Sequence, residues 1–162
     1  MSLFIFSLSH FLHILATVVW IGGIVMILLV ILPSATTALE SAPKTKLMTE
    51  ITRRFTPMAN ISILVLVATG IVIAFHQENF SGLMDFNNSW SVITLVKHVL
   101  VALMIIIHFY RGLILNPKIG RLSSERNDSQ VTRLQRFSLD LVKTNLVLGM
   151  MVLLLTGISS SL

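Results

Sequence analysis

The sequence contains no cysteine and very little charge. Without thiols, the chain forms no disulfide, no thiolate metal site and no cysteine-based catalytic centre. Charged residues make up 12% of the 162 residues and hydrophobic residues 54%, and the mean hydropathy is +0.87. A soluble domain of this length carries about twice that share of charge. The composition therefore argues against a soluble protein and indicates a membrane protein.

The apolar residues fall into four blocks that are long enough to cross a bilayer. A span of about 20 apolar residues matches the ~30 Å hydrocarbon layer, and these blocks are far longer than the ~10-residue strands of a membrane barrel. The sequence therefore predicts an all-α integral membrane four-helix bundle that forms one transmembrane domain over residues 1–162. No convincing internal repeat is found. The predicted helices cover residues 3–32, 58–76, 91–115 and 137–162.

Lysine and arginine are missing from some parts of the chain and concentrated in others. Residues 1–32 contain neither, which favours a retained helix over a secretory signal peptide. The connection 77–90 also contains neither, whereas the first and third connections are basic. By the positive-inside rule, those two connections face the cytoplasm, and both termini lie outside, in a multi-pass protein of the plasma membrane. The net charge of +5 therefore implies no nucleic-acid partner.

Prolines and spacing suggest where the helices end. Pro33 is expected to close the first helix and Pro117 the third. Leu47, Ile51 and Phe55 recur every four residues among basic residues, which predicts a short interfacial helix or an inward extension of the second helix.

Histidines inside the spans are the strongest functional signal, because ionisable groups are costly in a membrane. At ~1.5 Å per residue from the outer helix ends, His10 lies roughly 10 Å deep, His13 about 15 Å and His98 about 12 Å. His76 lies at the outer end of the second helix, and His108 lies on the order of 27 Å down. Three helices therefore offer imidazoles in the outer half of the membrane.

These imidazoles suit copper, zinc and haem iron alike. His10, His13, His98 and His76 are the candidate metal ligands, and His10 and His13, three residues apart, share a helix face. A histidine near a helix end can also be a polar residue that reaches the interface. His108 has no second histidine at its depth, so two bis-histidine haems do not follow.

Other polar groups in the spans need partners. Lys97 aligns along its helix with His108 and requires an acceptor, a haem propionate or a water path. Asp140 and Lys143 lie one turn apart, which predicts a mutual ion pair.

Short motifs then bring a family resemblance. His10-Phe11-Leu12-His13 followed by Trp20-Ile21-Gly22-Gly23 resembles the first helix of copper resistance D (CopD)-type membrane domains. Arg54-Phe55 with Thr69-Gly70-Ile71, the stretch from Lys97 to Asn116-Pro117, and Thr144-Asn145-Leu146 with Gly149 continue the likeness over most of the chain. The early His and Trp, with Lys97 and His108, are also similar to HemJ-type protoporphyrinogen oxidases, which implies a b-type haem. By position, His10, Lys97 and His108 match that pattern, and His98, which lies outside it, is a further candidate haem ligand.

Three hypotheses follow. The first is a CopD-like, non-enzymatic protein that handles copper at the outer histidines, alone or as an accessory subunit of a membrane metalloenzyme. The second is a haem b electron carrier or oxidoreductase. The third is a structural subunit without a cofactor. No nucleophile–base pair or phosphate-binding loop is found, and a chain with so little mass outside the bilayer is expected to have a membrane protein partner or to form a homo-oligomer.

Overall fold

The computed structural model describes residues 3–75, 89–124 and 128–160, and its regular elements there are all helices. The chain divides into two units, residues 1–80 and 81–162, each of which is described by itself. Four helical stretches are long and apolar enough to cross a membrane, which confirms the predicted all-α membrane protein. The orientation of the termini and the single domain stay predictions. The four stretches are Leu3–Ala38, Ser41–Ala74, Ser91–Ser123 and Ser129–Ser159.

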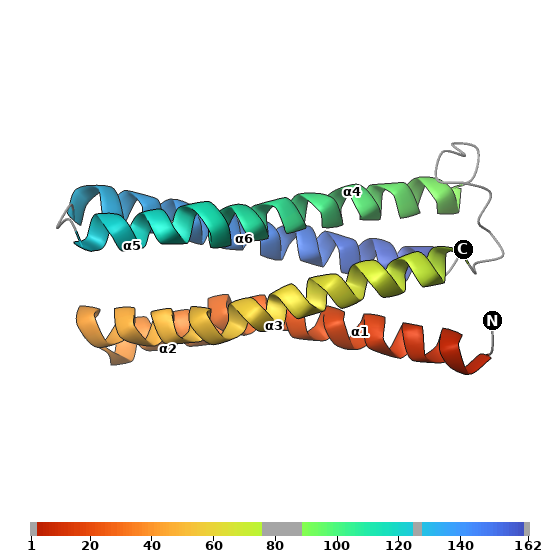
Figure 1. Cartoon of the computed structure of the whole chain (residues 1–162), viewed down its shortest axis with the longest axis horizontal. Coiled ribbons are helices and arrows are strands. Elements are labelled where there is room, and N and C mark those ends of the chain that lie inside the picture. The colour runs from red at the N-terminus through yellow and green to blue at the C-terminus, as the bar shows by residue number, and fades with distance from the viewer. Residues whose placement is uncertain (1–2, 76–88, 125–127, 161–162) are drawn as a thin grey trace. The chain divides into compact units, whose positions relative to one another are not determined.

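The first unit is a helical hairpin. Helix α1 (Leu3–Val25) continues through a π-helical turn, Met26–Ile31, into α2 (Leu32–Ala38). Leu39 adopts an extended conformation, with φ −126° and ψ 143°, and this reverses the chain. Helix α3 (Ser41–Phe75) then returns along α1 (Figure 1).

The second unit has the same order of elements. Helix α4 (Ser89–Tyr110) continues through a π-helical turn, Arg111–Leu115, into α5 (Asn116–Ser124). Helix α6 (Asp128–Ser159) then packs back along α4 and α5 (Figure 1). Its first nine residues precede residue 137, where the apolar block begins, so this helix starts earlier than hydropathy alone predicts.

The prediction that Pro33 and Pro117 end their helices is wrong. Each proline is instead the second residue of the segment that follows a π-helical turn, within the first turn, where a missing N–H is tolerated. Directly before each proline, a backbone N–H bonds five residues back, from Leu32 to Ile27 and from Asn116 to Arg111. The wider turn accommodates the proline ring, so the chain stays helical past it.

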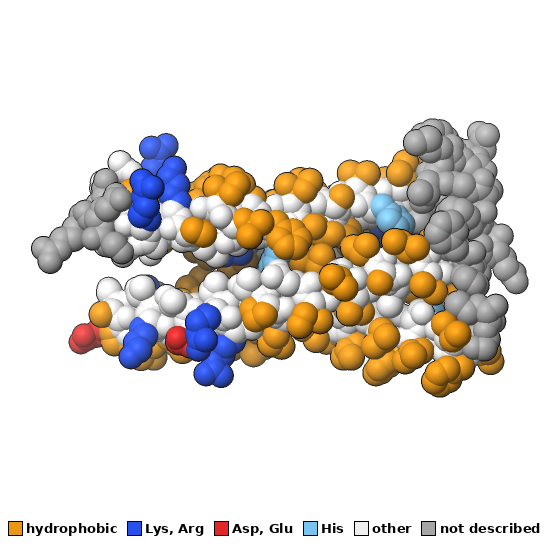
Figure 2. All heavy atoms as spheres, in the orientation of Figure 1, with side chains coloured by type: hydrophobic (Ala, Val, Ile, Leu, Met, Phe, Trp, Pro, Cys, Tyr) orange, Lys and Arg blue, Asp and Glu red, His pale blue; other side chains and the backbone are white. Residues whose placement is uncertain are grey.

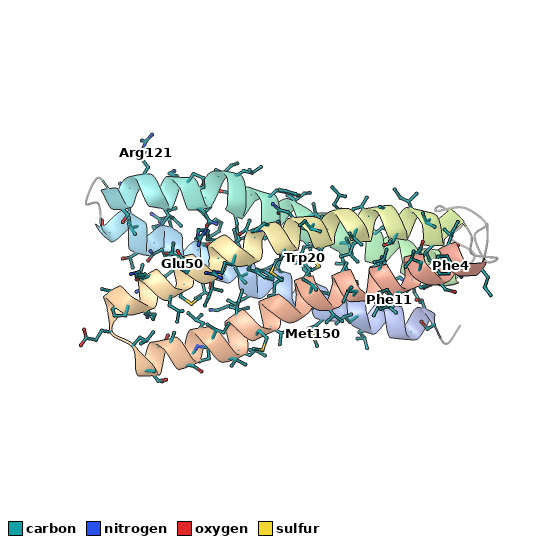
Figure 3. All side chains as sticks on the ribbon, turned by 60° about the horizontal axis from the view of Figure 1, so that its bottom comes forward. Phe4, Phe11, Trp20, Glu50, Arg121 and Met150 are labelled. Carbon is teal, nitrogen blue, oxygen red and sulfur yellow. The ribbon has the colours of Figure 1, made fainter. Side chains whose placement is uncertain are left out.

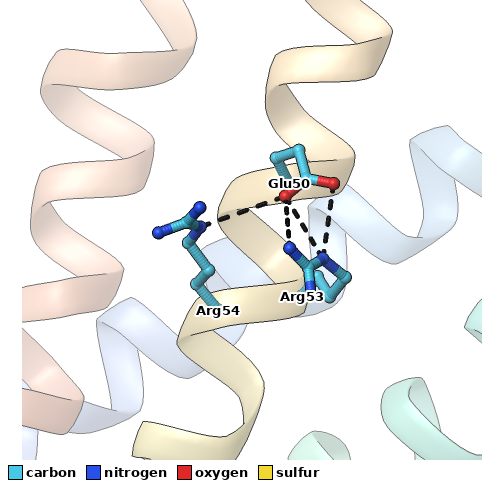
Figure 4. A network of polar contacts seen from close by, with 3 residues as sticks. All are labelled: Glu50, Arg53 and Arg54. Atoms are coloured by element: carbon cyan, nitrogen blue, oxygen red, sulfur yellow. Dashed lines mark hydrogen bonds and ion pairs between the residues drawn. The ribbon is translucent and has the colours of Figure 1, made fainter.

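The second predicted helix also begins earlier than its apolar block. Helix α3 starts at Ser41 and contains Pro57 in its interior, so the stretch extends the second helix and does not form a separate interfacial helix. On this extension, Glu50 accepts hydrogen bonds from Arg53, the shortest 2.8 Å, and lies 3.9 Å from Arg54 (Figure 4). All three side chains are well exposed, so the pairs add little stability. They do balance part of the positive charge at this end of the unit.

Buried side chains line one face of each helix of the first hairpin. On α1, Ala16, Trp20 and Ile24 follow one another at intervals of four residues, and Ala59 and Ile63 do the same on α3. Small residues at such positions allow two membrane helices to approach closely. Trp20, only 2% exposed, lies on α1 where this helix passes α3 (Figure 3).

The opposite faces of the helices are covered by exposed apolar side chains. Phe4 and Phe11 on α1 are 73% and 60% exposed (Figure 3), and Leu64 on α3 is 71% exposed. Figure 2 shows such hydrophobic side chains spread along both units. A soluble monomer rarely exposes patches of this size, whereas lipid tails cover them in a membrane.

The two units repeat one pattern, although the sequence shows no convincing repeat. Pro33 and Pro117 are 84 residues apart, and so are the two most deeply buried large side chains, Trp20 and Met104. On the returning helices, Thr69-Gly70-Ile71 is matched by Thr156-Gly157-Ile158. The repeat is hard to see in the sequence because so few identities mark it: the architecture is kept while the apolar residues change freely.

Candidate functional site

His13 is turned toward the partner helix of its own hairpin. Its ring nitrogen Nδ1 lies 2.8 Å from the hydroxyl oxygen of Thr69 on α3. That hydroxyl donates its own proton to the Val65 carbonyl at 2.6 Å, so the hydroxyl oxygen accepts and His13 Nδ1 carries the proton. The ring also passes close to Gly70, where a Cβ would lie at ordinary contact distance, 3.5 Å, from His13 Cε1. In the neutral ring, Nε2 therefore holds the lone pair.

His10 lies one turn earlier on α1 and has a different environment. It is exposed, and its ring meets Phe6 edge to face, with 4.6 Å between the ring centroids. Phe6 and His10 are four residues apart, so this contact lies along the surface of one helix. His10 is thus available to a ligand outside the hairpin, while His13 is held against α3. The predicted ligand His76 lies outside the described residues.

His98 on α4 is held in a single tautomer by the backbone. Its Nδ1 lies 2.6 Å from the carbonyl oxygen of Thr94, one turn earlier. A carbonyl oxygen only accepts, so Nδ1 is the protonated nitrogen and Nε2 of the neutral ring holds a lone pair. The side chain of His98 is exposed. This is the arrangement that proteins use to orient a metal-binding imidazole, with the second ring nitrogen donating to a carbonyl.

Lys97 has the partner that its position requires. Its ammonium nitrogen donates a 2.8 Å hydrogen bond to the hydroxyl of Ser159, the last residue of α6. Ser159 in turn bonds the Thr156 carbonyl at 3.1 Å. The long side chain therefore reaches toward the end of the hairpin, as lysines near membrane surfaces commonly do. A haem propionate is not needed to explain this lysine.

Lys97 and Ser159 are expected to contribute a measurable interaction. In a double-mutant cycle of Lys97→Met and Ser159→Ala, we expect a coupling of about 0.6 kcal/mol, up to ~1.7, as is typical of hydrogen bonds between membrane helices. Unfolding of the full chain in mixed detergent micelles measures it. Ser160→Ala is the control, because among the described residues the Ser160 hydroxyl bonds the Thr156 carbonyl, one turn earlier in the same segment. Strictly additive effects of Lys97→Met and Ser159→Ala would contradict the pairing.

At the other end of the second unit, His108 lies among different neighbours. Its ring meets Phe109 edge to face, with 5.5 Å between the ring centroids, and the positive charge of Arg111 lies close enough to repel a charged imidazole. Arg111 Nε donates a 3.1 Å hydrogen bond to the Ser138 hydroxyl on α6. Between these levels, Asn145 Nδ2 donates to the Met104 carbonyl at 3.3 Å. Hydrogen bonds thus join α4 and its π-helical turn to α6 at three heights.

The candidate residues do not form one ready-made metal centre. Within either unit, the described residues contain no group of three His, Asp or Glu side chains suited to a metal ion. The predicted ion pair of Asp140 and Lys143 is confirmed, with 3.3 Å between nitrogen and oxygen. The hydroxyl partners of His13, Arg111 and Lys97 are Thr69, Ser138 and Ser159. Of these, only Thr69 entered the sequence analysis, and only as part of a family motif. Isolated Ser and Thr residues in apolar helices stand out neither by charge nor by periodicity.

Two hairpins of membrane-spanning helices, with imidazoles oriented by their Nδ1 contacts, define a multi-pass membrane protein with candidate metal ligands. The family described as Copper resistance protein D matches residues 49–159, which is more than half of the chain. The chain therefore belongs to the copper resistance protein D family, as the motifs predicted. The matched range includes Lys97, His98 and His108, whereas His10 and His13 precede it. No curated protein and no solved structure was found to match.

Proposed function

We propose that this chain binds copper in the membrane through its histidines, with His98 as the principal ligand. His10, His13 and His76 are the further donors. The observation that supports this is the hydrogen bond from His98 Nδ1 to the Thr94 carbonyl, because it leaves Nε2 as the nitrogen with the lone pair on an exposed ring. Membership of the copper resistance protein D family supports copper over other metals that bind imidazole.

The proposed ligands are chemically suited to a copper ion. Imidazole nitrogens are suitable copper ligands, and a second ring nitrogen that donates to a carbonyl or hydroxyl makes the ligating nitrogen more basic. Both His98 and His13 have that arrangement, through Thr94 and Thr69. Copper bound there would be held by neutral side chains, and the protein would hold or pass the ion in the plasma membrane, alone or as an accessory subunit of a larger metalloenzyme.

His98→Ala is expected to weaken copper binding by about tenfold or more, since even losing an outer contact to a metal ligand costs 10–100-fold. The measurement is Cu(I) competition between the purified full chain and a chromogenic chelator. His108→Ala is the matched control, because it removes one histidine from the second unit but not a proposed copper ligand. The triple variant His10→Ala, His13→Ala, His98→Ala should bind no copper at these sites. Equal copper affinity in His98→Ala and wild type would contradict the proposal.

A b-type haem is the second candidate, favoured by the same tautomer of His98, which suits haem iron as well. His98, with His10 or His13, would hold it. Lys97 is the weaker choice, because it would have to leave Ser159. An absorption spectrum of the preparations used for the copper measurement separates the candidates, since only haem gives a Soret band. With neither metal nor haem bound, a structural subunit is the remaining explanation.

A further inference from the structure

A groove with a basic rim lies between α5 and α6 of the second unit, beyond the π-helical turn that follows α4. Its volume is about 350 Å³. Lys118 contributes from α5, and Gln130 and Arg133 contribute from α6. Leu134 and Phe137, one turn along from these on α6, form the apolar part of the lining. The groove is thus polar and cationic on one side and apolar on the other.

The two cations of the groove have no acidic partner within the described residues. Among the described residues of the second unit, Lys143 forms an ion pair with Asp140, whereas Lys118 and Arg133 form no ion pair with a carboxylate. An arginine guanidinium and a lysine ammonium together suit a phosphate group, which the guanidinium can bind with two hydrogen bonds. The Gln130 amide adds a neutral donor to the same lining.

Depth along the helices indicates which phosphate the groove meets. Counted from Ser91 and Ser159 at the opposite end of the hairpin, Lys118 and Arg133 lie about 40 Å along their helices. A bilayer with its headgroups is roughly 40–45 Å thick. Phe137 lies only about 33 Å along, close to the edge of the hydrocarbon layer. The cations therefore lie at the level of lipid phosphates, and the apolar lining lies at the level where acyl chains begin.

We propose that the α5–α6 groove binds an acidic glycerophospholipid of the leaflet predicted to be cytoplasmic. Its phosphate lies between Lys118 and Arg133, and the start of one acyl chain lies on Leu134 and Phe137. A soluble phosphate compound would use the cations alone and leave Phe137, 45% exposed, uncovered. Basic grooves between membrane helices on the cytoplasmic side bind anionic headgroups in this way. This proposal is independent of the copper proposal, because no histidine takes part in it.

Native mass spectrometry of the delipidated full chain tests the groove, with phosphatidylglycerol compared with phosphatidylcholine as the added lipid. We expect wild type to prefer phosphatidylglycerol, and the double variant Lys118→Gln, Arg133→Gln to bind it about 30-fold more weakly, from roughly 1 kcal/mol for each of the two basic residues. The control double variant Lys46→Gln, Arg136→Gln removes the same charge from exposed positions outside the groove, and should change the affinity less than about twofold.

Two further measurements distinguish a lipid from a soluble anion. Phe137→Ala should weaken phosphatidylglycerol binding, because the acyl chain loses its contact, and millimolar inorganic phosphate should not displace the lipid from wild type. Displacement by phosphate, or unchanged lipid binding in Phe137→Ala, would overturn the lipid assignment. Equal losses in the groove and control variants would show attraction by net charge alone, and would overturn the groove as a site.

Discussion

Trp20→Ala is expected to lower the free energy of unfolding of the full chain by about 3–5 kcal/mol, the usual cost of truncating a fully buried aromatic residue. Trp20 is 2% exposed and is one of the two most deeply buried large side chains. Lipid tails are as apolar as the side chains, so the hydrophobic effect does little to hold membrane helices together. Stability therefore depends on close packing. An internal cavity the size of an indole removes those packing contacts, and lipid tails cannot refill a space enclosed by helices.

The neighbouring residue Val18 provides the control for this substitution. It lies half a turn away on α1 and is 61% exposed, so Val18→Ala removes contacts with the surroundings only. Unfolding in mixed micelles of a mild detergent and dodecyl sulfate, followed by helical circular dichroism, should show the large loss in Trp20→Ala alone. Similar losses in both variants would mean that Trp20 does not pack within the protein as the structure shows.

Gly23→Ala is expected to destabilise the chain by about 1–3 kcal/mol through overpacking. A Cβ at Gly23 would overlap the aromatic ring of Phe55 on α3, with Phe55 Cζ only 2.6 Å away. Gly22, the preceding residue, has open space around its Cβ position, with no atom within 4 Å. Gly22→Ala makes the same chemical change on the same helix, and should leave stability unchanged or slightly raised, since alanine favours helix.

A double variant shows whether the Phe55 ring is the cause. Phe55→Ala alone loses packing, but it also removes the group that the new methyl would strike. The combination Gly23→Ala, Phe55→Ala should therefore be more stable than the sum of the single effects predicts, with a coupling of about 0.5–3 kcal/mol. Thermal unfolding in one detergent is sufficient. Additive effects, or equal losses from Gly22→Ala and Gly23→Ala, would rule out the clash.

The number and type of the membrane helices could be predicted from the sequence because the thickness of the hydrocarbon layer sets their length. Their ends could not. Pro33 and Pro117 favour a helix end, but a widened turn before each proline lets the helix continue to Ala38 and Ser124. Helix α3 likewise extends back to Ser41, through polar residues that a hydropathy profile does not mark as helix. Outside the bilayer, helix length depends on packing within the hairpin, which a hydropathy profile does not contain.

Only the residue types of the candidate site, and their places along the helices, could be read from the sequence. The position of His98 in its block identified it as a candidate, but its contact with the Thr94 carbonyl depends on the side-chain conformation. The partners of His13 and Lys97 depend on how α1 is aligned along α3 and how α4 is aligned along α6. That alignment cannot be predicted from one sequence. Lys97 shows this most clearly: its depth suggested a buried partner or cofactor, while its long stem reaches Ser159 at the end of α6.

The π-helical turns before Pro33 and Pro117 act as joints in the two hairpins. Each joint lies about 30–40 Å along its helix from the opposite end, where the hydrocarbon layer gives way to hydrated headgroups. A helix can bend there without exposing its backbone to lipid, because water is at hand to bond any carbonyl that the bend uncovers. His10 and His13 on α1, and His98 and His108 on α4, all lie before these turns, so a bend at either turn would redirect the segment beyond the proline and not the helix that carries the histidines.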